Sequence, residues 1–100
     1  MQFEGSKSSG HLTVDTVVCS KPCFLTGVQG YSDGSNAATM SIYDEASALT
    51  TGKILWKSAL LTNATNFVAH SWKFPVKCDN GIYVDVGTNT GFVVEYIEID

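Results

Sequence analysis

The sequence contains no arginine, and only 16% of its 100 residues are charged, well below the ~25% that is typical of globular proteins. Its six basic residues are lysines spread along the chain, and the formal net charge is −4. Without arginine to bind phosphate bidentately, and without a basic stripe, the chain is not expected to bind nucleic acid. A surface with so little charge favours association with other proteins.

Long apolar runs are also missing. No segment approaches the ~20 apolar residues that a membrane-spanning helix needs, and residues 1–10 contain no apolar core of a secretory signal. We therefore expect no membrane partner, and folding in a cytosol. The Gly/Ser-rich start has no core of its own, so residues 1–10 are predicted to form an N-terminal arm that becomes ordered on a neighbouring subunit. Residues 11–100 are predicted to form a single domain.

What the sequence does have is a regular alternation of β-type runs and turn signals, about every ten residues. Seven such runs cover residues 11–19, 23–30, 37–44, 53–61, 66–77, 81–86 and 91–99. This spacing predicts an all-β fold: an antiparallel β-sandwich of about seven or eight strands, either jelly-roll or immunoglobulin-like. The run 53–61 could alternatively make two helical turns, but its length and the threonines around it favour a strand.

The strongest turn signal is the segment 79–81, which reads Asp-Asn-Gly. Asn-Gly readily adopts the positive φ angles of a type I′ turn, and this predicts a hairpin between the two flanking strands. The aliphatic residues 82, 84 and 86 that follow should share one face of the next strand.

The strand before that turn carries a row of large side chains. Val68, His70, Trp72 and Phe74 are predicted to share one of its faces, because alternate residues of a strand point the same way. Pro75 cannot donate to a β-ladder, so it marks an edge, a bulge or a break between two short strands.

Two cysteines, Cys19 and Cys23, flank a Ser-Lys-Pro segment that is typical of a turn joining two strands. A metal site would need Cys78 and the two histidines to complete the ligand set, and the spacing matches no zinc motif. A disulfide between Cys19 and Cys23 is geometrically allowed, but cytosolic folding favours reduced thiols. We interpret these cysteines as small buried hydrophobic residues with their thiols close together at the base of the turn, and expect no metal or cofactor.

No grouping of catalytic residues emerges, and the chain is expected not to be an enzyme. His70 lies within a strand, where it is interpreted as a packed or interfacial imidazole and not as a general base. Asp44 and Glu45 are adjacent, so they should point to opposite faces of a strand or be solvated in a turn, and they make no glycosidase pair. Asp33 and Asp79 are explained as turn residues. A small enzyme or metal protein remains an alternative only if the three cysteines converge with a histidine.

The aromatic residues carry the remaining functional signal. Phe3, Tyr31, Trp56 and Trp72 are predicted to form a partner interface, since aromatic side chains are enriched at protein interfaces. As an alternative, Trp56, Trp72, Tyr31 and Tyr43 could stack on sugar rings. One or both tryptophans could instead belong to the core.

Several local patterns between residues 23 and 98 point to one group of proteins. A strand ends in Ile42–Asp44, a glycine turn leads into Gly52–Leu55, and Trp72–Pro75 precedes the segment Asn80–Val84. These patterns resemble those of small tailed-phage virion proteins. The cysteines 19 and 23 are not part of the resemblance.

The resemblance implies a β-sandwich that serves as a capsid decoration (cement) protein, without catalytic residues. Its partners would be the major capsid protein or other virion subunits, with a homo-oligomer as a further option, and it would be located in the virion after assembly in the host cytoplasm. A neck or tail component, or a glycan-binding module of a tail fibre, is the alternative.

Overall fold

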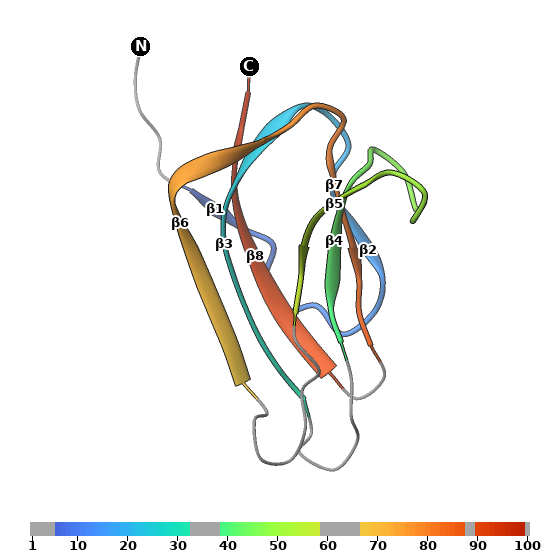
Figure 1. The fold of residues 1–100 in the computed structure, drawn as a ribbon, viewed down its shortest axis with the longest axis vertical. Coiled ribbons are helices and arrows are strands. Elements are labelled where there is room, and N and C mark those ends of the chain that lie inside the picture. Colours follow the sequence, from blue (N-terminus) through green and yellow to red (C-terminus); the bar gives the residue numbers. More distant parts are fainter. Residues whose placement is uncertain (1–5, 33–38, 59–66, 88–89, 100) are drawn as a thin grey trace.

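The computed structural model describes residues 6–32, 39–58, 67–87 and 90–99. These ranges form eight strands in two antiparallel sheets of four, a β-sandwich, which confirms the predicted all-β fold class (Figure 1). The first sheet has the order β1 (Lys7–Ser8), β8 (Thr90–Glu98), β3 (Cys23–Ser32) and β6 (Phe67–Cys78). The second sheet has the order β2 (Thr16–Cys19), β7 (Ile82–Asp85), β4 (Ser41–Asp44) and β5 (Lys53–Lys57).

The strands pair in a nested pattern. β4 pairs with β5, β3 with β6, β2 with β7 and β1 with β8, each pair enclosing the previous one along the sequence. Two further ladders, β3–β8 and β4–β7, join these pairs into sheets. Of the described strands, only β4 and β5 are both consecutive and paired, so most connections carry the chain from one sheet to the other.

The segment 79–81 is one of these crossings, and the predicted hairpin there is wrong. β6 and β7 flank the segment but belong to different sheets. The backbone of Gly81 passes so close to other strands that a Cβ would lie 2.3 Å from the Cys19 carbonyl oxygen and 2.9 Å from that of Glu45. Glycine is therefore required at position 81 because three backbone segments approach one another closely there. The Asn-Gly pair does not form the turn of a two-stranded hairpin.

The core lies between the sheets and is built from alternate residues of their strands. Its buried members are Cys19, Cys23, Leu25, Val28, Met40, Ile42, Cys78, Ile82, Val84, Phe92 and Val94. Gly30 sits in the tightest part, where a Cβ would lie 2.6 Å from the Phe92 Cβ and 2.7 Å from the Met40 Cε. Trp56 and Trp72 are partly buried and pack against the margin of this core.

Strand β6 is irregular in its middle. Ser71 pairs with Gly27 and Val76 pairs with Leu25, so residues 72–75 face Thr26 alone. Pro75 falls in this irregular section of an edge strand, as predicted. The strand bends sharply in Figure 1. Of the four side chains predicted to share a face, Val68 and Trp72 pack against the core, whereas Phe74 is 77% exposed.

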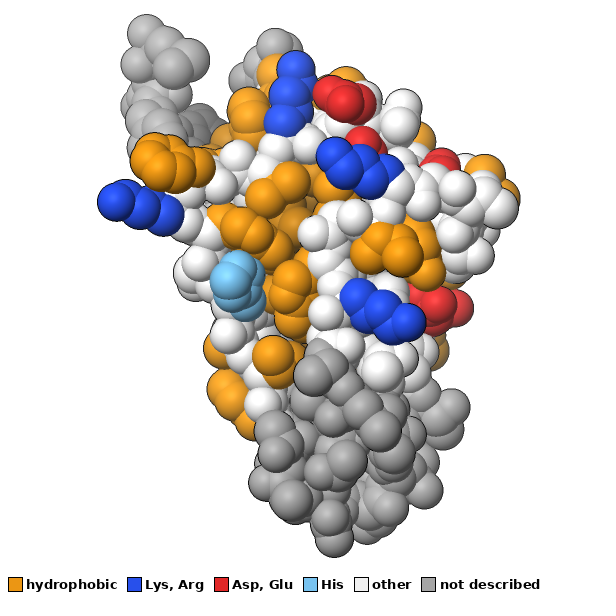
Figure 2. Space-filling view, in the orientation of Figure 1, with side chains coloured by type: hydrophobic (Ala, Val, Ile, Leu, Met, Phe, Trp, Pro, Cys, Tyr) orange, Lys and Arg blue, Asp and Glu red, His pale blue; other side chains and the backbone are white. Residues whose placement is uncertain are grey.

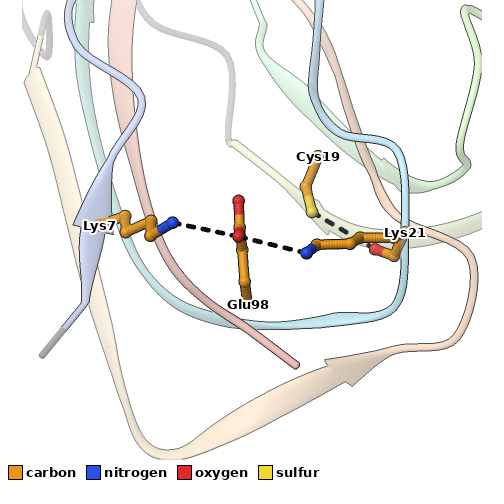
Figure 3. Close-up of polar contacts among 4 residues, drawn as sticks. All are labelled: Lys7, Cys19, Lys21 and Glu98. Carbon is orange, nitrogen blue, oxygen red and sulfur yellow. Dashed lines mark hydrogen bonds and ion pairs between the residues drawn. The ribbon is translucent and has the colours of Figure 1, made fainter. Parts of the chain in front are cut away.

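The described part of the predicted N-terminal arm is held by its own chain. Lys7 and Ser8 pair with β8, and Leu12 exchanges two backbone hydrogen bonds of 2.9 Å with Phe92. The Lys7 ammonium also lies 3.1 Å from the Glu98 carboxylate, which Lys21 approaches to 3.4 Å (Figure 3). Phe3 lies outside the described residues. Within the described ranges, no helix is long and apolar enough to cross a membrane.

Candidate functional site

The most unusual surface belongs to β5 and β6, two of the four edge strands. Among the described strands each has only one neighbour in its sheet, so each presents unpaired backbone N–H and C=O groups along its other side. Four of the six lysines lie in these two strands, at positions 53, 57, 73 and 77, and neither strand contains an acidic residue. A protein with a formal net charge of −4 therefore carries two basic edges.

Large apolar side chains are exposed on the same strands. Phe74 is 77% exposed, Phe67 59% and Ile54 52%. The Lys73 ammonium lies 5.7 Å from the centre of the Phe74 ring, within the range of a cation–π contact. Figure 2 shows hydrophobic side chains gathered over the face between β6 and β5, with lysines around them. We call the exposed side chains of β5 and β6 the edge surface.

Trp56 and Trp72 form the inner margin of the edge surface. Trp56 pairs with the buried Ile42, so its side chain points toward the core from the edge of the second sheet. Trp72 packs against the core from the edge of the first sheet. His70 contacts Trp72 edge-on, with ring centroids 4.6 Å apart. His70 itself is exposed, so it is a surface imidazole that packs against Trp72.

Tyr31, the third described member of the predicted interface, lies on the outer face of the first sheet. It is 43% exposed and stacks on His11, with ring centroids 5.7 Å apart and a 2.9 Å hydrogen bond between Oη and Nε2. A Cβ at Gly91 would lie 2.5 Å from that Nε2, so glycine makes room for the stack. Phe67 is the cross-strand neighbour of Tyr31, which joins this aromatic patch to the edge surface.

Asp44 ends strand β4 and is not solvated in a turn, which excludes one of its two predicted settings. Only 5% of it is exposed, and its carboxylate accepts three backbone hydrogen bonds. The donors are the N–H groups of Asp79 (3.1 Å), Asn80 (2.8 Å) and Gly81 (3.2 Å). Asp44 therefore anchors the crossing that ends β6, which is a structural role. Its partners lie more than thirty residues along the chain, so no local signal could have identified it.

A second pair of carboxylates was missed by the sequence analysis. Burial raises the pKa of Asp85, and the nearby Asp15 raises it further. The carboxylate of Asp15 also accepts a 2.8 Å hydrogen bond from the backbone N–H of Val86. Burial and the same two carboxylates raise the pKa of the Tyr83 hydroxyl. Because Asp15 and Asp85 come from opposite ends of the chain, their proximity follows from the pairing of β2 with β7.

The three cysteines converge at one end of the sandwich. All three are buried and unbridged, and Cys19 and Cys23 lie at the two ends of the turn that joins β2 to β3, as predicted. Cys78, which no local pattern connects with Cys23, lies directly opposite it in the β3–β6 ladder. A hydrogen bond between these two thiols, together with burial, raises the pKa of Cys23. The same hydrogen bond lowers the pKa of Cys78.

The histidines do not join this thiol cluster, since His11 contacts Tyr31 and His70 contacts Trp72. The condition set for an enzyme or metal site, three cysteines with a histidine, is therefore not met in the described part of the chain. Among residues 6–32, 39–58, 67–87 and 90–99, no group of three or more His, Cys, Asp or Glu side chains could hold a metal ion.

Comparison with known proteins adds no assignment. No family model matches the sequence, and neither the curated proteins nor the solved structures contain a match. The resemblance to small tailed-phage virion proteins rests on the sequence patterns alone.

Proposed function

We propose that this protein is a non-enzymatic structural subunit of a virion, most specifically a capsid decoration protein that binds the major capsid protein through the edge surface. One observation carries the proposal. A chain with few charges places exposed apolar side chains (Phe67, Phe74 and Ile54) and four of its six lysines on two edge strands. Exposed apolar groups on long edge strands are unfavourable for a solitary protein and are typical of a surface that is covered by a partner.

The nested strand pairing supports the viral part of the proposal. Pairs that enclose one another, with four strands in each sheet, are the arrangement of a jelly roll, and we include this finer fold assignment in the proposal. Jelly rolls are common in viral capsid proteins and in lectins. The fold is therefore compatible with both the favoured function and its glycan-binding alternative.

The edge surface also predicts the chemistry of the partner. Burying a side chain the size of Phe74 contributes about 1.5–3 kcal/mol, so a small number of such contacts stabilises a complex. The lysines that border these side chains attract acidic groups and accelerate association at low salt. The unpaired backbone of β6 can accept an extended segment as an additional strand. We therefore expect the partner to present an apolar segment flanked by acidic residues.

Co-sedimentation with capsids tests this proposal. The capsids are assembled from the major capsid protein of the same genome and carry no decoration protein. We expect the wild-type protein to sediment with them. Phe74→Ser should bind about tenfold more weakly, because it removes one anchor residue that is buried in the complex.

Val14→Ser is the matched control, because Val14 is 68% exposed but lies outside β5 and β6. It should bind like the wild type. Absence of sedimentation, or equal loss in both variants, would contradict the proposal. Electron cryo-microscopy of whole particles then separates a position on the head from one in the neck or tail.

Glycan binding is a second candidate, and the Tyr31–His11 stack favours it. This stack is an exposed, nearly flat aromatic platform, with 14° between the two ring planes, and such platforms bind the apolar faces of sugars. A glycan array probed with wild-type protein and with Tyr31→Ala tests it. Signals that depend on Tyr31 would support the lectin function, and an array without signals would exclude it.

A further inference from the structure

The thiol cluster has a geometry that the proposed function does not use. Cys23 and Cys78 are cross-strand partners in the antiparallel β3–β6 ladder, and both are fully buried. Residues opposed in such a ladder have Cα atoms about 4.5–5.5 Å apart, inside the range of about 4.4–6.8 Å that a disulfide spans. Both cysteines are unbridged, and the interaction between the two thiols is the largest influence on the pKa of each.

We propose that Cys23 and Cys78 are a redox modification site, at which a reversible cross-strand disulfide ties edge strand β6 to β3 when the protein meets a disulfide oxidant such as glutathione disulfide. This inference is independent of the partner that the edge surface binds.

The reaction is a two-step thiol–disulfide exchange. The Cys78 thiolate attacks one sulfur of glutathione disulfide, which breaks that S–S bond and releases one glutathione thiolate. The Cys23 thiol then loses its proton and attacks the Cys78 sulfur, which forms the protein disulfide and releases the second glutathione. The two protein sulfurs are oxidised by two electrons in total, and glutathione disulfide is reduced to two glutathione molecules.

Cys78 attacks first because it lies on edge strand β6, whereas Cys23 lies on β3 between two neighbouring strands. In the closed ladder the interaction with Cys23 also lowers the pKa of Cys78, and the thiolate is the nucleophile.

The oxidant reaches Cys78 because β6 is an edge strand with a weak point. Residues 72–75 face Thr26 alone, so the pairs that join residues 76–78 to β3 form a short section separated from the rest of the ladder. This section has one neighbouring strand, a few backbone pairs and the three hydrogen bonds that Asp44 accepts just beyond it. It therefore opens at lower free energy than the whole domain. Opening it exposes Cys78 while the core of the sandwich stays folded.

Cys19 is the competing partner for Cys23, since these two thiols also interact, but its place in the fold disfavours it. Its thiol donates a 3.4 Å hydrogen bond to the Lys21 carbonyl oxygen (Figure 3), as the Cys78 thiol does to the Val76 carbonyl oxygen at 3.6 Å. Burial raises its pKa, so less of it is thiolate. Cys19 also ends a strand of the second sheet, whereas Cys78 is held opposite Cys23 by the backbone ladder itself.

Trypsin distinguishes the alternative bridges directly. It does not cleave after Lys21, because Pro22 follows, so Cys19 and Cys23 stay together in peptide 8–53 while Cys78 begins peptide 78–100. The folded full-length protein is incubated with glutathione disulfide, alkylated, digested without reductant and analysed by mass spectrometry. We expect peptide 8–53 linked to peptide 78–100, and loss of this species after reduction with dithiothreitol.

Two variants assign the bridge to its residues. Cys19→Ala should keep the linked species, and Cys23→Ala should lose it. Oxidation should raise the melting temperature of the wild type and of Cys19→Ala by about 10 °C, because the bridge closes a long loop in the unfolded chain. It should leave Cys23→Ala unchanged.

Three results would overturn the proposal. The first is wild-type protein without the linked peptides. The second is a peptide 8–53 lighter by two hydrogen atoms with Cys78 alkylated, which would place the bridge between Cys19 and Cys23. The third is a linked species that persists in Cys23→Ala, which would place it between Cys19 and Cys78.

Discussion

The two edges of the first sheet, β1 and β6, are built in opposite ways. β1 has two residues, both polar and exposed, and the Ser9 hydroxyl beside it accepts the Val94 N–H of β8 at 2.9 Å. β6 has twelve residues, with exposed phenylalanines at its first residue, Phe67, and in its irregular section, Phe74. Short polar edges are a common protection against strand addition, and long apolar edges invite it. The difference indicates that one edge of this sheet is closed by its own chain and that the other is available to a partner.

The comparison depends first on the anchoring of β6, and the largest effect is expected there. Asp44→Ala removes the acceptor for three backbone N–H groups at the end of this strand. We expect the free energy of unfolding to fall by roughly 3 kcal/mol, because buried donors are left without partners. Urea denaturation measures it. Asp44→Asn keeps one carbonyl oxygen and should lower the free energy of unfolding by less. If Asp44→Ala left this free energy unchanged, β6 would not be anchored at this end.

Strand β3, the neighbour of β6, should also be tightly packed against the core. Its Gly30 pairs with Val68 of β6, and Gly30→Ala would place a methyl group 2.6 Å from the Phe92 Cβ. Overpacking of this kind costs about 1–3 kcal/mol of stability. Gly27→Ala is the control on the same strand, since its nearest contact would be an ordinary 3.5 Å. Equal melting temperatures of the two variants would contradict the close packing.

The outer side of β6 should matter for association and not for folding. The double substitution Lys73→Glu and Lys77→Glu reverses the charge of this edge, and we expect the association rate with capsids to fall several-fold at low salt. The effect should shrink as salt is added, because the charges are exposed. Ser8→Glu on β1 should leave the rate within error. Surface plasmon resonance at two salt concentrations makes the comparison, and equal rates for both variants would remove the distinction between the edges.

The smallest effect is expected at β1, where Lys7 and Lys21 lower the pKa of the Glu98 carboxyl. A carboxyl whose pKa is lower in the folded state stabilises the fold above its unfolded pKa of about 4.5, and this contribution disappears as the pH falls through the folded value. Lys7→Met should therefore destabilise slightly at pH 7 and not at pH 3. Thermal melts of both proteins at pH 7 and pH 3 test this pH dependence. A larger difference in melting temperature at pH 3 than at pH 7 would contradict it.

Sequence patterns predicted the elements of this fold better than their connections. Strong alternation and turn residues located the seven strands from β2 to β8, whereas β1 was missed because two polar residues carry no periodicity. The Asn-Gly pair at 80–81 correctly marked a change of direction, but a local signal cannot tell whether the next strand joins the same sheet. That choice is made by the distant Asp44 carboxylate and by the close approach of Gly81 to Cys19.

In the candidate site, too, residue types were recognised from the local sequence, whereas their burial and pairing depend on distant residues. Tyr31, Trp56 and Trp72 were recognised as aromatic side chains of functional interest, but the tryptophans turned out to be partly buried. Phe74, the most exposed aromatic side chain among the described residues, was wrongly predicted to share a face with Trp72. The register shift opposite Thr26 depends on β3 and leaves no trace in the sequence of β6. The pairing of Cys23 with Cys78 was missed for the same reason.

The nested order of the strands sets the order in which the molecule can be completed. β4 and β5 are separated by the shortest connection of any pair, and each enclosing pair joins segments that lie farther apart. Closing long loops is slow, so folding is expected to proceed outward from this hairpin. β8 is the strand that gives β1 its partner and β3 its second one. During synthesis the first sheet therefore stays incomplete until β8 has left the ribosome. Only then does β6, with its part of the edge surface, lie at the edge of a complete four-stranded sheet.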